Sequence, residues 1–280
     1  MKKMIFIVLV IFMITGTVTA QLDGLSAGVE IGVVDLSYTS DSLFIRPLAV
    51  YETELSLGID IYAELGIPFG FGPDFWLGID LNLKAIYSFQ VGLDSTLDVS
   101  LENWTYLPFG SDTILLTANT LGGPWMYAAS AESYLGLGAK YTHMMSFGEV
   151  FGLAEIPFIL FQADGMNPFG WVGFNLTGGI ELPSGIGGGL KINNNLRPKA
   201  NFLINMDLFG FYKMDPFLFA LDIGIPLFKD GIKNHGITFV PSVKYDLDMG
   251  ITIFAGIPVM RIGSDHKMAF GFNLGAKYEF

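Results

Sequence analysis

The feature that most constrains this chain is a long stretch in which apolar and polar residues alternate. From Phe75 to Leu93 every second side chain is apolar, and the intervening positions are polar or small except for Trp76 and Ile86. A period of two places the two kinds of residue on opposite faces of a β-strand. The stretch is about three times longer than a typical strand of ~5–6 residues, so its length discriminates between kinds of sheet.

The length fits a strand that crosses a lipid bilayer. A tilted transmembrane strand needs about 9–11 residues within the hydrocarbon. Phe75 and Tyr87 lie on the apolar face, and at ~3.3 Å per residue and ~45° tilt they are about 28 Å apart along the membrane normal. Aliphatic residues fill the interval between these two rings. An aliphatic band with aromatic edges is typical of the outer surface of a transmembrane barrel.

The same alternation recurs along the chain, separated by links rich in Gly, Asp, Asn, Ser and Pro. It predicts an all-β fold, a closed antiparallel up-and-down transmembrane β-barrel of about 14 strands. Twelve or sixteen strands are the alternatives, because 41–50 contains Pro47, 185–193 is rich in glycine, and 114–120 is assigned to a loop although a strand is possible there. The predicted strands are 25–38, 41–50, 53–67, 75–93, 96–106, 131–145, 148–161, 169–182, 185–193, 199–212, 216–228, 235–247, 250–260 and 267–280.

The links differ in length at the two ends of the predicted barrel. Links after even-numbered strands are tight, whereas links after odd-numbered strands are longer, except for the short first link at 39–40. Short periplasmic turns and longer outer loops are typical of bacterial barrels. The longest link is 107–130, which either folds inward as a constriction or covers a route for apolar substrates. Apolar-Pro-apolar triplets tend to end the odd-numbered strands, where proline interrupts strand pairing.

The first twenty residues predict export. A basic start precedes an apolar run at 4–14, and the small residues Val18 and Ala20 precede a predicted cleavage after Ala20. The run is too short to cross a bilayer as a helix. We therefore predict a cleaved signal peptide at 1–20 and a single outer-membrane barrel domain at 21–280.

The composition excludes several classes of protein. A chain that is 14% aromatic is not disordered, and one without cysteine has neither disulfides nor Cys-ligated zinc. A net charge of −12 argues against nucleic-acid binding. The three histidines, His143, His235 and His266, are scattered, and neither a metalloprotease nor a nucleophile-elbow motif occurs. An Asp265–His266 cluster with Asp230, His235, Asp164 and Asp112 is the alternative, but we predict no enzyme, no cofactor and no metal site.

The polar positions of the alternation supply the candidate functional residues. A charged side chain on the lipid face costs about 2–4 kcal/mol near the midplane, so these residues need a wet lumen or ion-pair partners. Acids outnumber bases, so an aqueous lumen is expected to attract cations; the alternative is that acid–base pairs neutralise one another inside a narrow, filled barrel. Inward glycines, among them Gly58, Gly78 and Gly179, are interpreted as leaving room inside. The lumen-facing candidates are Glu54, Asp60, Glu64, Asp80, Lys84, Asp98, Glu102, Asp222, Lys244 and Asp246.

The last five residues, Ala276-Lys277-Tyr278-Glu279-Phe280, carry a family resemblance. A final strand of this pattern that closes on Phe resembles the assembly signal of bacterial outer-membrane β-barrel proteins, the porin-like superfamily. The resemblance implies that Tyr278 and Phe280 are assembly residues read by the barrel-assembly machinery. It also implies a location in the outer membrane of a diderm bacterium, in contact with outer-membrane lipid.

We therefore expect a porin-like passive channel for small solutes with a mild preference for cations. The alternatives are a structural or surface-interaction (adhesin-like) barrel with a plugged lumen, a transporter of apolar molecules, and a soluble secreted β domain.

Overall fold

A computed structural model describes fourteen segments of the chain: residues 24–35, 42–55, 58–71, 75–109, 115–117, 126–128, 132–162, 170–171, 173–195, 203–229, 237–247, 249–257, 260–262 and 268–280. The predicted signal peptide lies outside these residues, and so does the first link at 39–40. The same is true of the loop cluster of Asp112, Asp164, Asp230, His235, Asp265 and His266. Within the described segments, no helix is both long and apolar enough to span a membrane.

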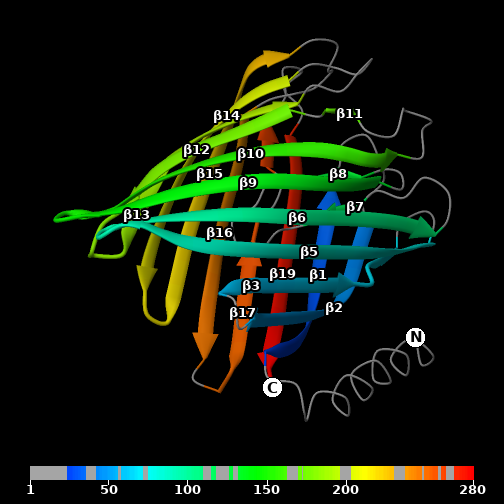
Figure 1. The fold of residues 1–280 in the computed structure, drawn as a ribbon. Coiled ribbons are helices and arrows are strands. Elements are labelled where there is room, and N and C mark those ends of the chain that lie inside the picture. Colours follow the sequence, from blue (N-terminus) through cyan, green and yellow to red (C-terminus); the bar gives the residue numbers. More distant parts are fainter. Residues whose placement is uncertain are drawn as a thin grey trace.

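The described strands form a closed antiparallel barrel of 14 strands, which confirms the predicted fold class and strand number. Closure is made by β1, which pairs with β2 on one side and with β19 on the other, and Figure 1 shows β1 (blue) beside β19 (red). The wall consists of β1 (Leu25–Asp35), β2 (Ser42–Leu55), β3 (Ile59–Gly66) with β4 (Phe69–Phe71), β5 (Phe75–Gly92), β6 (Ser95–Phe109), β9 (Glu132–Met145), β10 (Gly148–Gln162), β11 (Gly170–Trp171) with β12 (Gly173–Glu181), β13 (Ile186–Asn195), β14 (Leu203–Met214), β15 (Phe217–Lys229), β16 (Ile237–Leu247), β17 (Ile251–Gly256) with β18 (Met260–Ile262), and β19 (Met268–Glu279).

Three wall strands are described as two elements each, and proline explains one of these divisions directly. β3 and β4 keep one register against both β2 and β5, so they are a single strand broken at Ile67 and Pro68. Proline has no N–H to donate, but its carbonyl still accepts from the amide of Gly78 at 2.8 Å. The amide of Ile67 likewise donates to the carbonyl of Pro47 at 2.9 Å. Pro47 itself lies inside β2.

Several predicted boundaries differ from the observed ones. β2 extends to Leu55, so the predicted link at 51–52 is wrong. β6 extends to Phe109, which takes the start of the predicted 107–130 loop into the wall. Within that loop, β7 (Leu115–Thr117) and β8 (Met126–Ala128) pair as a separate two-stranded sheet, so part of 114–120 does form a strand. The tight turn predicted at 146–147 is confirmed, and the one predicted at 94–95 lies one residue earlier, at 93–94.

The two faces of the barrel wall differ in composition as the alternation predicts. The outer face carries large apolar side chains that are exposed on the isolated chain, such as Leu83 (42%), Leu176 (47%) and Phe219 (43%). The other face, called the inner face below, carries Glu30, Arg46 and Asp80, all of which are buried. Aromatic rings lie at both edges of the apolar band on β5, with Phe75 63% and Tyr87 41% exposed.

The inner face divides into two parts. On the strands from β17 through β19 and β1 to β6 it has a closely packed part: Phe44, Arg46, Asp80, Trp104, Tyr106 and Phe254 are all buried. We call this the packed region. On β9, β10 and β12 to β16, by contrast, every described inner-face side chain is at least partly exposed, and the buried positions there are glycines. We call this the open wall.

Candidate functional site: the inner face

The strand register places all ten candidate residues of the sequence analysis on the same face as Arg46. Glu54 lies opposite Asp60, Lys84 opposite Glu102, and Asp80 opposite Gly66. Asp222, Lys244 and Asp246 reach the same face on β15 and β16. The structure brings Glu64 and Asp80 together in one cluster, and it distributes the other eight over both parts of the inner face. The clustered pair meet through a residue that is absent from the candidate set, Arg46.

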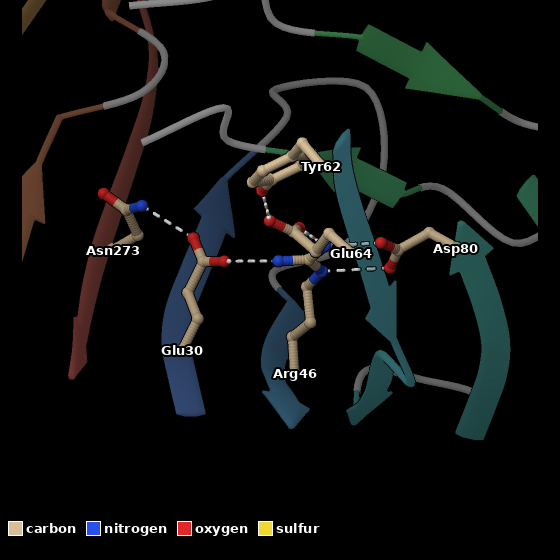
Figure 2. A network of polar contacts seen from close by, with 6 residues as sticks. All are labelled: Glu30, Arg46, Tyr62, Glu64, Asp80 and Asn273. Carbon is tan, nitrogen blue, oxygen red and sulfur yellow. Dashed lines mark hydrogen bonds and ion pairs between the residues drawn. The ribbon is translucent and has the colours of Figure 1, made fainter. Parts of the chain in front are cut away.

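Arg46 is the centre of a buried ionic network that joins five wall strands (Figure 2). Its Nε donates to Asp80 Oδ2 at 2.9 Å, and its Nη2 contacts both Asp80 Oδ1 and Glu64 Oε1. Its Nη1 lies 3.5 Å from Glu30 Oε2. The fork geometry of a guanidinium suits such two-point contacts with carboxylates. One side chain of β2 therefore ties β1, β3 and β5 together.

Two neutral residues complete the network. Asn273 on β19 donates from Nδ2 to Glu30 Oε1 at 2.7 Å, and the Tyr62 hydroxyl donates to Glu64 Oε2. Glu30 and Asn273 thus connect the first and last strands on the inside of the barrel, where the backbone ladder of β1 and β19 closes it. The network therefore stabilises the contact between β1 and β19 as well as the packed region.

The charges of this network do not balance. Three carboxylates, Glu30, Glu64 and Asp80, surround one guanidinium. Taking an ion pair out of water costs several kcal/mol per ion, which the pair regains only with good geometry and further hydrogen bonds. Here Asp80 and Glu64 have such bonds, whereas Glu30 Oε2 has the ion pair and no hydrogen bond within the described residues. Loss of Arg46 would leave all three acids without their cation.

Glycines in the packed region are covered by rings, which corrects the interpretation that they leave room. A Cβ added at Gly78 would lie 2.6 Å from Cε2 of Tyr106, and one at Gly32 or Gly275 would collide with the ring of Phe44 or Phe254. Tyr106 is fully buried. These rings fill the inner face over the neighbouring strand. Gly58, also interpreted as an inward glycine, instead lies in a turn with φ +72°.

Outside the packed region, most basic side chains of the inner face have acidic partners. The ion pairs are Lys84–Glu102 at 3.5 Å, Lys140–Glu149 at 4.0 Å, Lys213–Glu181 at 2.6 Å, Lys244–Asp246 at 2.9 Å and Lys277–Glu52 at 3.8 Å. Among the described residues, Glu54, Asp60, Asp98 and Glu155 belong to no salt bridge. These unpaired carboxylates and the network around Arg46 contribute to an excess of acid over base on the described part of the inner face.

The described residues hold no cluster of side chains suited to bind a metal ion. They contain no group of three or more His, Asp or Glu side chains able to hold a metal ion. His143 lies on the outer face near the tight turns, as the alternation predicts, and its Nδ1 is 2.8 Å from Ser95 Oγ. The Tyr141 hydroxyl donates to the same Ser95 oxygen at 3.0 Å. This group is an outer-face contact between β6 and β9.

The candidate set of the sequence analysis lacks five residues of the network and its surroundings: Glu30, Arg46, Tyr62, Asn273 and, as a packed side chain, Tyr106. A signal for Arg46 was available, because it is one of only three arginines in the chain and occupies the polar parity of its strand. Trp104 and Tyr106 lie in β6 and are buried on the inner face.

Comparison with known proteins gives similarity in structure only. No family model and no curated protein sequence matches the chain. Among solved structures, a mutant of Rh. blastica porin is 12% identical, with a TM-score of 0.43, over 91% of this chain and 99% of that chain. A second mutant of the same porin is 10% identical, with a TM-score of 0.43 over the same shares.

Proposed function

We propose that the chain is an outer-membrane channel for passive diffusion of small solutes, with a mild preference for cations. The observation that carries this proposal is the open wall. A closed barrel has no contact with bulk water through its wall, so partly exposed inner-face side chains on β9, β10 and β12 to β16 imply space inside. Charged side chains on that wall, including Lys191 and Asp222, need water or partners. A wet path along the open wall satisfies them.

The packed region narrows the proposed path but does not close it. Its buried residues lie on the strands from β17 to β6. Below it, towards the tight turns, Glu54 and Asp60 are exposed on the same strands. The path we propose is therefore eccentric: it is wide near the tight turns and confined to the open wall farther up. A barrel plugged as an adhesin-like scaffold would need its open wall covered as well.

The preference for cations is expected from the unpaired acids. Glu54 and Asp60 lie side by side across β2 and β3, where two like charges repel one another unless a cation is near. Glu52 adds a third carboxylate on the same face of β2. It forms an ion pair with Lys277, at 3.8 Å. Rings of acidic side chains favour cations in aqueous pores, although screening limits the effect at physiological salt.

The experiment that tests the proposal is planar-bilayer recording with the purified, folded barrel. We expect stepwise conductance and, under a KCl gradient, a reversal potential shifted towards that of potassium. The double variant Glu54→Gln/Asp60→Asn is expected to reduce that shift while leaving channels that insert and conduct. Folded protein that inserts into the bilayer without conducting would overturn the channel. An unchanged reversal potential in the double variant would overturn the assignment of these acids.

We further propose export through the signal peptide at 1–20, insertion into the outer membrane, and recognition of Tyr278 and Phe280 by the barrel-assembly machinery. The contacts of these residues support the assignment. Their rings meet edge to face with centroids 4.9 Å apart, and both lie on the outer face, 45% and 44% exposed. The Phe280 amide also donates to the Leu25 carbonyl at 3.1 Å. An apolar outer face of 14 strands requires lipid around it.

A further inference from the structure

The open wall carries a row of inner-face residues that crosses five strands in one register. Phe151 on β10 lies opposite Gly179 on β12, Gly179 opposite Gly189 on β13, Gly189 opposite Phe209 on β14, and Phe209 opposite Asp222 on β15. Two aromatic residues therefore flank a pair of adjacent glycines. The row ends on a carboxylate.

The Phe151 ring lies over Gly179, and the Phe209 ring lies over Gly189. A Cβ at Gly179 would lie 2.6 Å from Cζ of Phe151, and a Cβ at Gly189 would lie 2.7 Å from Cζ of Phe209. Any other residue at either position would displace a ring. The ring centroids are 6.4 Å apart and the ring planes are inclined by 33°. Both side chains remain partly exposed, so the aromatic surface that they form faces the interior.

On the open wall, two lysine ammonium groups each contact both an aromatic ring and a carboxylate. Lys140 Nζ lies 5.3 Å from the centroid of the Phe151 ring and 4.0 Å from Glu149 Oε1. Lys213 Nζ lies 5.2 Å from the centroid of the Phe211 ring and 2.6 Å from Glu181 Oε2. Each group consists of a ring, a carboxylate and an ammonium. The negative face of a ring and a nearby carboxylate both attract a cation.

Phe209 and Asp222 have the first two components of this arrangement. They are direct cross-strand neighbours. Among the described residues, no lysine or arginine lies over the Phe209 ring, and Asp222 belongs to no salt bridge. Lys191 on β13 lies opposite Asp207 on β14, on the same face. These two residues lie beside Phe209 and Asp222, one step farther from the tight turns.

We propose that Phe209 and Asp222 form a binding site for organic ammonium solutes, such as amines with an apolar or aromatic substituent. The carboxylate attracts the charged group, the Phe209 ring accepts it by a cation–π contact, and the adjoining Phe151 ring contacts the apolar part. This inference rests on the proposed channel and names the class of solute that the path favours. Size-matched anions and neutral molecules lack the charge that the site recognises.

The test is a comparison of three probes on single channels and on detergent-solubilised barrel. Benzyltrimethylammonium is expected to block the current in a concentration-dependent way, whereas benzyl alcohol and benzenesulfonate block it much less. Phe209→Ala is expected to weaken the block about threefold to tenfold, and Asp222→Asn about threefold. Two controls leave the block unchanged: Phe219→Ala, which removes an outer-face ring of β15, and Asp94→Asn, which removes a carboxylate in the turn before β6.

The outcomes separate the two proposals. Conductance with equal block by all three probes, or block that Phe209→Ala and Asp222→Asn leave unchanged, overturns the site and leaves the channel standing. Absence of conductance overturns the channel. The site is then tested on the solubilised barrel by saturation-transfer NMR with benzyltrimethylammonium. Binding that both variants weaken supports the site, and equal binding by wild type and variants overturns it.

Discussion

Arg46 and Asp80 form a two-point contact although their strands are not neighbours: Nε of Arg46 lies 2.9 Å from Oδ2 of Asp80, and β3 runs between them. The contact passes over Gly66, which pairs with Asp80 in the register. A Cβ at Gly66 would lie 2.5 Å from Asp80 Oδ2 and 2.6 Å from Arg46 Nε. The missing side chain at Gly66 is what allows the salt bridge to span the strand.

Gly66→Ala is therefore expected to destabilise the barrel by about 1–3 kcal/mol, the usual cost of overpacking a well-packed interior. The matched control is Gly136→Ala, on the inner face of β9, where the nearest atom to an added Cβ is 3.8 Å away. Unfolding by urea in lipid vesicles, followed by tryptophan fluorescence, measures both variants. Equal stability of the two variants would show that the space over Gly66 has no special role.

Arg46→Met is expected to cost about 3–5 kcal/mol, because it leaves two buried carboxylates and the half-buried Glu64 without their cation. Adding Asp80→Asn to this variant should restore part of the loss, since one uncompensated charge is removed. Lys213→Met is the control: its side chain is 52% exposed, and exposed pairs contribute about 0–1 kcal/mol. If Asp80→Asn worsens the stability of Arg46→Met, the charge argument is wrong.

A pair of arginine substitutions in β12 tests which face of the strand is the outer one and which is the inner one. Leu176→Arg places a charge on the outer face, at a side chain that is 47% exposed, and should cost about 2–4 kcal/mol of folding free energy if this part of β12 lies near the bilayer midplane. Thr177→Arg points to the open wall and should cost much less. Folding titrations in phospholipid vesicles give both values. A reversed order of the two costs would exchange the inner and outer faces.

Phe280→Ala should lower the amount of assembled barrel in cells and leave the stability of the refolded protein close to that of wild type. Phe272→Ala is the control, because Phe272 is also on the outer face of β19 and 41% exposed. Heat-modifiable mobility of the membrane fraction on gels reports assembly. Equal loss of assembled barrel in the two variants would assign the effect to general lipid contact.

The alternation of apolar and polar residues was sufficient to predict the strands of the barrel wall, because it is a local property of the sequence. A period of two identifies strands and faces without any knowledge of what each strand contacts. This is why the strand number and the tight turn at 146–147 agree with the structure, and why the turn predicted at 94–95 is only one residue away, at 93–94. Strand ends are less well specified. β2 continues past residue 50 because Glu52 and Glu54 keep the polar parity through Leu55.

The network around Arg46 could not be predicted in the same way, because parity gives the face and not the neighbours. Glu30 and Asn273 are 243 positions apart, and Arg46 and Asp80 are 34 apart. The interpretation of Gly78 as a position that leaves room inside failed for the same reason. Gly78 is small by itself, but the register places Tyr106 one step along the next strand, and the ring occupies the space.

Thiol labelling tests the division of the inner face most directly, because the natural chain has no cysteine. Thr177→Cys and Ser242→Cys lie on the open wall, Val50→Cys lies on the packed inner face with 2% exposure, and Leu176→Cys faces outward. A charged methanethiosulfonate reagent applied to membrane-inserted barrel should modify the first two and change their current, and should leave Val50→Cys and Leu176→Cys unmodified. Unreactive cysteines at 177 and 242, or a reactive one at 176, would contradict a water-filled path along the open wall.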